Sequence, residues 1–382
     1  MIGKVVKGTM RMKKKVMLVF GTRPEAIKMC PLVNELKGRE EIETVVCVTG
    51  QHRQMLDQVL SVFNVVPDYD LSIMRQGQTL FDITTDILES IKKVLENVSP
   101  DIVLVHGDTS TAFVTALASY YLQIDVGHVE AGLRTYNIYS PFPEEFNRQA
   151  IGIISKYNFA PTQMAADNLI KEGKNPDSIY ITGNTVIDAM RHTVKEDYSH
   201  PELEWVGDSK LIFITAHRRE NLGQPMRNMF RAIRRVLEEH SDCKAIYPIH
   251  LNPVVRKLAD EELNGCDRIH IIEPIDVFDC HNFEARCFMC LTDSGGIQEE
   301  VPAYGKPVLV MRDTTERPEG VKAGTLKLVG TDEEMIYQNF TELLENKKAY
   351  DAMAKACNPY GDGQACKRIA DILEKGGYEP WC

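Results

Sequence analysis

The chain has 382 residues, of which 43% are hydrophobic and 26% charged, a composition typical of a globular protein with more than one core. Its net charge of −11 at pH 7 argues against nucleic acid or an anionic membrane surface as the main partner. The ten cysteines follow no framework spacing, which favours a reducing cytoplasm, and no apolar run is long enough to span a membrane.

Short apolar runs with β propensity alternate with helical patterns through the first half of the chain. The predicted strands are residues 16–20, 44–49, 102–105, 126–129, 157–160 and 179–182. Between them, the stretches 52–63 and 80–98 have the apolar spacing of amphipathic helices. Asp68-Tyr69-Asp70 matches a DxD metal pattern, but it follows Pro67 and is interpreted as a turn.

The second half repeats this alternation, with predicted strands at residues 211–215, 245–249, 269–272, 288–291, 308–311 and 326–329. Strands that alternate with helices form parallel sheets with helices on both faces, so the chain is predicted to fold as two doubly wound α/β domains. Residues 191–210 are polar and lack a strand pattern, which places the boundary between domains 1–190 and 191–363. The apolar pattern of the last helix does not determine which domain it joins.

Polar residues collect at the carboxyl ends of the predicted strands, where ligands of open parallel sheets bind. The residues that follow five of these strands are Arg23 and Lys28, Asp108, Glu130 and Arg134, His217 to Arg219, and the turn of Ser294, Gly295 and Gly296. A solvated charge or a helix cap would explain one such position, but five together indicate a binding or catalytic site.

A further candidate is the stretch SPFPEEFNRQAI, where Pro143 can start a helix that places Glu144 and Arg148 four residues apart on one face. Alone, this spacing favours an ordinary surface ion pair. Together with Asp108 and Glu130 it favours a catalytic constellation.

Several cofactor motifs are missing from the sequence. No GxGxxG follows a strand, no GxxxxGK[ST] occurs, and there is no HExxH or second CxxC pair, so neither a nicotinamide cofactor nor a metal is predicted. Cys287 and Cys290 form a single CxxC in an apolar run, and they are interpreted as buried core thiols.

The stretch LTDSGGIQEE leads from an apolar run into a tight turn and a helix start, whose free N–H groups suit a phosphate. Two carboxylates, Glu299 and Glu300, follow within one helical turn. An acid at this place can accept hydrogen bonds from a ribose diol, so the turn 294–296 is predicted to hold a diphosphate and Glu300 the ribose. Arg317 is predicted to add a phosphate contact. The pattern indicates a nucleoside diphosphate as ligand.

The chain resembles the non-hydrolysing UDP-N-acetylglucosamine 2-epimerase family from about residue 16 to 365. The motifs that carry the resemblance include VFGTRPEAIKM, VHGDTSTAF, GHVEAGLRTYNIYSPFPEEFNRQ, TAHRRENLG, LTDSGGIQEE and GKPVLVMRDTTERPEG. The resemblance implies a GT-B fold, in which two Rossmann-like doubly wound parallel-sheet domains face a central cleft. It also implies that the last helix, about 364–382, packs back on the first domain.

The family interconverts UDP-GlcNAc and UDP-ManNAc. The resemblance therefore implies a cytoplasmic isomerase, a homodimer without cofactor or metal, that supplies ManNAc units for surface polysaccharide biosynthesis. In the family, UDP leaves by C1–O cleavage as C2 loses its proton, and UDP then re-adds to a 2-acetamidoglucal intermediate while C2 is reprotonated on the other face. Such a route needs cations on the diphosphate and carboxylates near C1 and C2.

The family's functional positions match residue types in this chain. Its catalytic set falls on Asp108, Glu130, Glu144, Arg148 and His217. Its substrate-binding set falls on Arg23, Lys28, Ser294, Gly295, Gly296, Glu300 and Arg317. Many bacterial relatives bind a second UDP-GlcNAc as an activator, and the matching residues here are Gln51, His52, Gln54, Gln78, Arg218 and His250.

The chain departs from the family's pattern at two positions. Cys280 stands where many relatives have an aromatic residue beside the uracil pocket, so stacking is expected to be weaker or to pass to Phe278. Gly77 stands before Gln78 where relatives with the activator site have an Arg, and Arg75 is the alternative cation.

Three other interpretations of the sequence stay open. A GT-B glycosyltransferase that uses a UDP-sugar would share the fold and the turn 294–296 but would not need Asp108, Glu130 and Glu144. A hydrolysing 2-epimerase would release free ManNAc and UDP. A non-catalytic UDP-sugar sensor would not need the acids, which are intact in this chain.

Overall fold

The computed structural model describes residues 13–50, 53–75 and 77–378, and the chain divides into two compact units. The first unit runs to Thr185 and takes up the chain again from Gln364, whereas the second unit is Val186–Gly363. Helix α7 (Thr185–Thr193) begins at the change of unit. The first unit therefore ends a few residues before the boundary expected at 190. The chain passes into the second unit at the start of helix α7 and not in the polar stretch 191–210.

The first unit is built on a seven-stranded parallel sheet with the order β3-β2-β1-β4-β5-β6-β7. The strands are β1 (Lys14–Phe20), β2 (Ile42–Val48), β3 (Tyr69–Asp70), β4 (Ile102–His106), β5 (Asp125–Val129), β6 (Tyr157–Ala160) and β7 (Ile179–Ile181). Every residue of β4 is buried, as expected for a strand covered on both faces. The prediction of a turn at residues 68–70 is wrong, because Tyr69 and Asp70 form strand β3. This edge strand is too short to show the sequence pattern of a strand.

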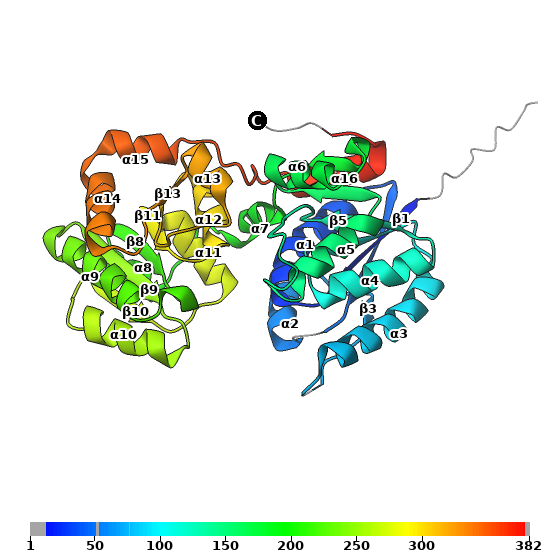
Figure 1. The fold of residues 1–382 in the computed structure, drawn as a ribbon, viewed down its shortest axis with the longest axis horizontal. Coiled ribbons are helices and arrows are strands. Elements are labelled where there is room, and N and C mark those ends of the chain that lie inside the picture. Colours follow the sequence, from blue (N-terminus) through cyan, green and yellow to red (C-terminus); the bar gives the residue numbers. More distant parts are fainter. Residues whose placement is uncertain (1–12, 51–52, 76, 379–382) are drawn as a thin grey trace, which may run out of the picture. The chain divides into compact units, whose positions relative to one another are not determined.

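Helices cover both faces of this sheet (Figure 1). They are α1 (Arg23–Lys37), α2 (Arg53–Val62), α3 (Leu80–Val98), α4 (Ser110–Tyr121), α5 (Glu144–Ile154), α6 (Gln163–Lys171) and α16 (Ala365–Lys375). Neighbouring helices α3, α4 and α5 form one layer, and α2, α1 and α16 form the other. Thr22 and Thr79 begin α1 and α3 with capping boxes, which fix where these helices start.

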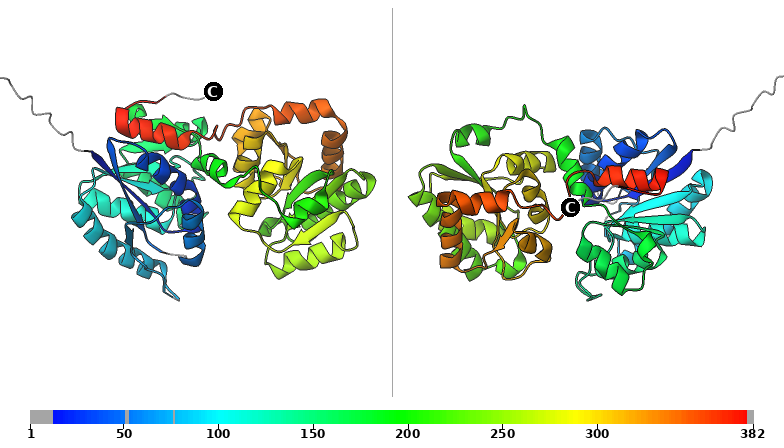
Figure 2. Two further views of the ribbon diagram at one scale, coloured as in Figure 1. Left: turned by 180° about the vertical axis from the view of Figure 1, so that it is seen from behind. Right: turned by 90° about the horizontal axis from the view of Figure 1, so that it is seen from above.

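The C-terminal helix α16, red in Figures 1 and 2, belongs to the first unit and lies beside α1. Arg39 Nη1, just after α1, donates to Asp371 Oδ1 at 2.7 Å and to Glu374 Oε2 at 3.1 Å. Arg368 Nη1 donates to the Thr182 carbonyl at 3.2 Å. These polar contacts, which an apolar pattern cannot reveal, attach α16 to the first unit.

The second unit is built on a six-stranded parallel sheet with the order β10-β9-β8-β11-β12-β13. The strands are β8 (Lys210–Thr215), β9 (Cys243–Pro248), β10 (Ile269–Ile272), β11 (Met289–Thr292), β12 (Val308–Val310) and β13 (Leu326–Leu328). The helices are α8 (Pro201–Val206), α9 (Gln224–Glu239), α10 (Pro253–Leu263), α11 (Val277–Arg286), α12 (Ile297–Glu300), α13 (Pro318–Ala323), α14 (Glu333–Glu345) and α15 (Lys347–Ala354), with 3₁₀ turns η2 (Arg219–Asn221) and η3 (Val301–Tyr304). Side chains of α9, α10 and α14 pack in one core cluster, and those of α8, α11 and η3 pack in another.

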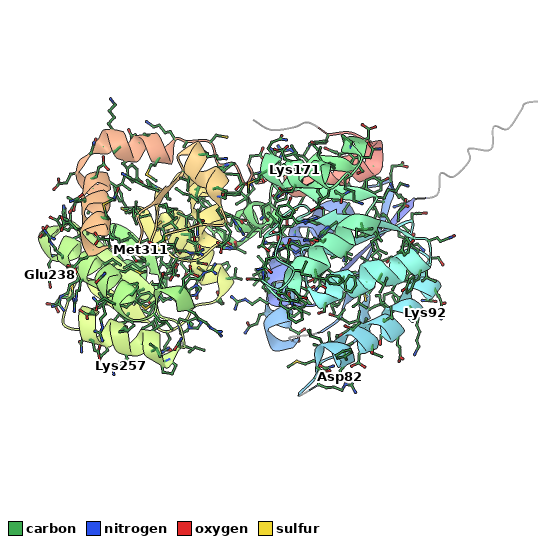
Figure 3. The ribbon with its side chains drawn as sticks, in the orientation of Figure 1. Asp82, Lys92, Lys171, Glu238, Lys257 and Met311 are labelled. Carbon is green, nitrogen blue, oxygen red and sulfur yellow. The ribbon has the colours of Figure 1, made fainter. Side chains whose placement is uncertain are left out.

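The prediction of two doubly wound parallel sheets is confirmed. Met311, directly after β12, is fully buried, whereas Lys92, Glu238 and Lys257 lie on the solvent sides of their helices (Figure 3). Among the described residues, every helix is too short or too polar to serve as a membrane span.

Candidate active site

Asp108 lies in the loop after β4, and two residues of α5 hold it there. Arg148 Nη2 pairs with the Asp108 carboxylate, and Arg148 Nη1 lies 3.3 Å from Glu145 Oε2. Asn147 Nδ2 donates to the Asp108 carbonyl at 2.8 Å. The structure thus brings together Asp108 and Arg148, two residues of the expected catalytic set.

Glu130 follows β5 and has a left-handed backbone conformation, with φ of 64°. Residues with a side chain seldom adopt this conformation, and it occurs at functional sites where the surroundings enforce it. Lys28 of α1 pairs with Glu130 Oε2, and Asn184 Nδ2 donates to the same oxygen at 3.1 Å. His106 Nε2, at the end of β4, lies 3.6 Å from it. The Arg23 side chain, at the start of α1, makes no hydrogen bond or ion pair with the described residues.

Asp108 and Glu130 have opposite electrostatic surroundings. Burial raises the pKa of Asp108 above its ordinary value of 3.8, and the Arg148 charge offsets part of the rise. Burial alone would also raise the pKa of Glu130, but the charge of Lys28 and the contact with His106 outweigh it and hold this pKa well below 4.5. Two acids whose pKa values are pushed apart are suited to the proton-carrying and the ionised role in acid–base chemistry.

Glu130→Gln is expected to make the stability of the protein depend less on pH under acidic conditions. Because the pKa of folded Glu130 lies below 4.5, its ionised form contributes stability that is fully present above pH 4.5 and is lost as the pH falls further. The melting temperature of the wild type, followed by circular dichroism from about pH 5 to 3, should fall more steeply than that of the variant. Equal slopes would show that Lys28 does not stabilise the ionised carboxylate.

Glu144 is the first residue of α5 and is half-buried, but Arg148 does not form the i,i+4 ion pair that the spacing allows. The second ion pair of Arg148 goes to Glu145 instead. Glu145 is fully buried and accepts hydrogen bonds from the backbone N–H groups of Thr135 and Tyr136, both at 3.0 Å. The burial of Glu145 could not be predicted, because nothing in the sequence distinguishes the two adjacent acids Glu144 and Glu145.

Glu25 is a second buried acid that sequence analysis did not identify. Its carboxylate accepts hydrogen bonds from the N–H groups of Gly21 and Thr22 at 3.0 and 2.8 Å, and from the Thr109 hydroxyl at 2.7 Å. Glu25 thereby ties the loop after β1 to the loop that carries Asp108. The T-x-x-E spacing of a capping box was the signal that could have revealed it.

Asp293, which directly follows β11, organises the site in the second unit. It is fully buried, and its carboxylate accepts hydrogen bonds from the N–H groups of His217 at 3.0 Å and Arg218 at 2.9 Å, and from Asn221 Nδ2 at 3.1 Å. The loop after β8 is therefore fixed to the start of the turn 294–296. Burial lowers the pKa of His217 below 6.5 despite the Asp293 charge, so His217 is mainly neutral at pH 7.

The turn 294–296 is also fixed from its other end. Gln298 Nε2 donates to the Ser294 carbonyl at 3.0 Å, and the Thr315 hydroxyl donates to Gln298 Oε1 at 2.5 Å. Thr315 lies in the segment after β12, which also carries Arg317. Two separate loops of the second unit thus hold this turn in place.

The two carboxylates at the end of α12 have different partners. Glu299 is buried and pairs with Arg317 Nε, so it holds beside the turn the residue expected to contact phosphate. Glu300 folds back towards the helix start, where a Cβ added to Gly296 would lie 3.2 Å from Glu300 Oε1. Glu300 Oε2 lies 3.9 Å from His281 Nε2. Glycine at position 296 therefore gives the Glu300 carboxylate room against the turn.

A cavity of about 280 Å³ opens beside this turn within the second unit. Its lining combines the polar side chains of His217 and Ser294 with apolar ones such as Ile275, a mixture typical of small-molecule sites. Cys280 also lines it. Phe278, the expected substitute for a stacking residue, is not part of this lining, and its ring packs on Tyr198 with the centroids 5.6 Å apart.

The residues expected for an activator site fall in separate places. Those that lie outside the described residues are Gln51, His52 and the side chain of Gln54. In the first unit, Gln78 Nε2 donates to Asp86 Oδ2 at 3.0 Å, and Arg75 pairs with the same carboxylate. Arg75, the alternative cation, is therefore already engaged.

The other two expected activator residues, Arg218 and His250, lie near the turn of the second unit. Arg218 Nη2 would lie 3.5 Å from a Cβ added to Gly295. The His250 ring stacks on the His217 ring with the centroids 5.4 Å apart. Arg218 therefore lies beside the turn, and His250 lines the cavity.

A sequence model of the UDP-N-acetylglucosamine 2-epimerase family matches residues 34–374. The chain is 61% identical over 361 residues to the UDP-N-acetylglucosamine 2-epimerase of Bacillus subtilis (strain 168), covering 94% of this chain and 95% of that protein. It is 49% identical over 369 residues to the protein of the same name from Escherichia coli (strain K12), covering 94% and 98%. It is similar to the crystal structure of UDP-GlcNAc 2-epimerase from Neisseria meningitidis bound to UDP-GlcNAc, with a TM-score of 0.82, 47% identity and coverage of 94% and 99%.

Proposed function

The chain belongs to the UDP-N-acetylglucosamine 2-epimerase family, and we propose that it epimerises UDP-GlcNAc to UDP-ManNAc reversibly by eliminating UDP and adding it back. The observation that carries this mechanism is the pair Asp108 and Glu130, two acids held by Arg148 and Lys28 whose pKa values are shifted in opposite directions. A glycosyltransferase that uses a UDP-sugar would not need such a pair, so this alternative is not favoured.

Elimination makes C2 chemistry possible for a sugar that has no carbonyl beside its C2 proton. Cleavage of the C1–O bond sends the electron pair to UDP, and loss of the C2 proton then gives the neutral 2-acetamidoglucal. We assign the removal of the proton to the ionised Glu130 and the return of a proton to Asp108, which Arg148 holds in place. Exchange of protons with water afterwards restores both acids.

The second unit supplies the groups that a nucleoside diphosphate needs. We place the diphosphate at the N–H groups of the turn 294–296, the ribose diol at Glu300 and the uracil in the cavity beside Cys280. His217 lines the same cavity and is mainly neutral, so it contributes a hydrogen bond rather than a charge.

Proton NMR of UDP-GlcNAc incubated with the protein in D2O, with EDTA and without added NAD, tests the mechanism. UDP-ManNAc should appear, and deuterium should enter at C2, because the proton that Asp108 returns to C2 has been exchanged with the solvent. Turnover without exchange at C2 would exclude elimination. Release of free ManNAc and UDP would identify a hydrolysing epimerase, and absence of turnover a sensor.

The assembly and setting of the enzyme remain predictions from the family resemblance. We propose a homodimer, which light scattering after gel filtration would detect as twice the chain mass of 43.2 kDa. A monomer at working concentration would contradict it. We also propose a cytoplasmic location and the supply of ManNAc units for surface polysaccharide.

Glu300→Ala is expected to weaken binding of UDP as well as of UDP-GlcNAc by about 1.5–3 kcal/mol, the scale of hydrogen bonds to a charged group. Calorimetric titration of UDP and 2′-deoxy-UDP against wild type and variant gives four binding free energies, which form a thermodynamic cycle. The penalty for removing the 2′-hydroxyl should be smaller in the variant. A coupling energy near zero would mean that Glu300 does not contact the ribose.

A further inference from the structure

Glu284 is a fully buried acid on α11 that the proposed reaction does not use. Its Oε1 accepts a hydrogen bond from the Cys280 thiol at 3.1 Å. Its Oε2 is buried, no Lys or Arg among the described residues pairs with it, and the Glu300 carboxylate is the neighbour that can accept a hydrogen bond from a proton on this side chain. Burying an ionised carboxylate without a cation is costly, so this side chain is neutral and carries a proton.

The acidic neighbour of Glu284 is Glu300. Oxygens of the two carboxyl groups and a ring nitrogen of His281 all lie within 4.8 Å of one another. The two Glu300 oxygens face different ways, because Oε2 is directed towards His281 and Oε1 lies against Gly296 of the turn. Two ionised carboxylates at this spacing would repel each other, so a proton between them is the stable arrangement.

We propose that Glu284 is a positioning residue for the nucleotide: its proton forms a hydrogen bond to Glu300 and fixes the Glu300 oxygen that faces the turn. This inference rests on the proposed function, because it takes Glu300 as the acceptor for the ribose diol of UDP. Burial, and then the charge of Glu300, raises the pKa of Glu284 well above 4.5. The Cys280 thiol bound to Glu284 lines the cavity, so one buried acid supports two parts of the nucleotide site.

Glu284 is the acid whose ionisation changes the charge beside Glu300 as the pH rises. The other titratable or charged groups around it are Cys280 and His281 of α11, Cys287, Cys290, Tyr304 of η3 and, beyond these, Arg191, Arg286 and Lys306. Burial raises the pKa of Cys287 and of Tyr304 to about 12, and those of Cys280 and Cys290 well above 9. These thiols and the phenol stay neutral, so they do not account for a loss of UDP binding.

A rise in pH through the pKa of Glu284 removes the proton and leaves two carboxylates that repel each other. Glu300 then no longer presents its oxygen in a fixed place, and UDP affinity should fall by up to about tenfold for each further pH unit. The change of UDP affinity with pH therefore reports on the ionisation of residue 284.

Two substitutions test whether Glu284 positions Glu300 or only fills space in the core. Glu284→Gln keeps an N–H donor for Glu300 and an acceptor for Cys280, but it cannot ionise. Glu284→Met fills the space and removes the donor. Calorimetric titration of UDP from about pH 7 to 8.5 with EDTA should show falling affinity for the wild type and a flat profile for both variants. At pH 7 we expect the Gln variant to match the wild type and the Met variant to bind about tenfold more weakly.

Melting temperatures distinguish this role from a structural one. Replacing a buried acid by an apolar side chain is often neutral or stabilising, so Glu284→Met should melt no lower than the wild type while its UDP affinity falls. Glu273→Gln, at an exposed position paired with Arg256, is the control and should keep the wild-type pH profile. Wild-type UDP affinity in the Met variant, or a wild-type pH profile in the Gln variant, would overturn the proposal.

A metal ion held by the same cluster is the competing outcome. Zinc or manganese that raises the melting temperature of the wild type, but not of Glu284→Gln, would show a metal site and overturn the positioning role. Exchange at C2 in D2O, together with a UDP pH profile that does not depend on residue 284, would remove this inference alone. Absence of C2 exchange would remove the proposed function itself.

Discussion

Asp108→Asn and Glu130→Gln are each expected to slow turnover by roughly a hundredfold or more, the scale of losing an acid or base group. The amide in Asp108→Asn cannot release the proton that the acid would return to C2, and the amide in Glu130→Gln cannot accept one. Both substitutions keep the shape of the side chain beside Arg148 and Lys28. UDP affinity should therefore change much less than turnover.

Initial rates by NMR and calorimetric titration of UDP measure these two effects separately. Glu89→Gln, at an exposed position of α3, is the matched control and should turn over normally. Glu144→Gln, the third acid expected from the family resemblance, should show the same loss. Near-normal turnover in any of the three variants would remove that residue from the catalytic set.

Asp293→Asn is expected to lower the free energy of unfolding by about 2–4 kcal/mol, because a buried amide N–H would replace one acceptor oxygen. The N–H groups of His217 and Arg218 and the Asn221 amide all donate to this carboxylate. The added N–H would face these donors and leave at least one of them without an acceptor. UDP affinity should fall with stability, since the same contacts fix the turn 294–296.

Urea unfolding and UDP titration of Asp293→Asn provide the measurement. Asp208→Asn, at an exposed position of the same unit, is the control and should change neither quantity. Unchanged stability in Asp293→Asn would mean that the loop after β8 does not depend on this carboxylate. A fall in stability with wild-type UDP affinity would mean that the turn keeps its shape without the loop.

The strands of the core could be predicted because each is a run of buried apolar residues between polar loops. β4 is the clearest case, since all five of its residues are buried. β3 could not be predicted, because two residues paired with the end of β2 show no alternation. The apolar pattern of α16 did not show which unit it joins, and only the family resemblance indicated the first; there, polar contacts of Arg39 and Arg368 add to its buried apolar face.

The site was predictable in part, because strand ends of a parallel sheet lie at one edge. This rule identified Asp108 and Glu130, but it contains no information about which groups pair. Arg148 could reach Glu144 by spacing alone, and it pairs with Glu145 and Asp108 instead. The scaffold acids Glu25, Glu145 and Asp293 were missed, because no pattern in the sequence marks which acids are buried.

The return of α16 to the first unit has a consequence for synthesis on the ribosome. The second unit is a continuous insertion, and Arg191 Nη2 near its start donates to the Asp362 carbonyl near its end at 2.6 Å. It can therefore complete its fold before α16 is synthesised, whereas the first unit stays incomplete until α16 emerges. The part of the protein that is made first is thus the part that finishes folding last, and until then α1 exposes the face that α16 will cover.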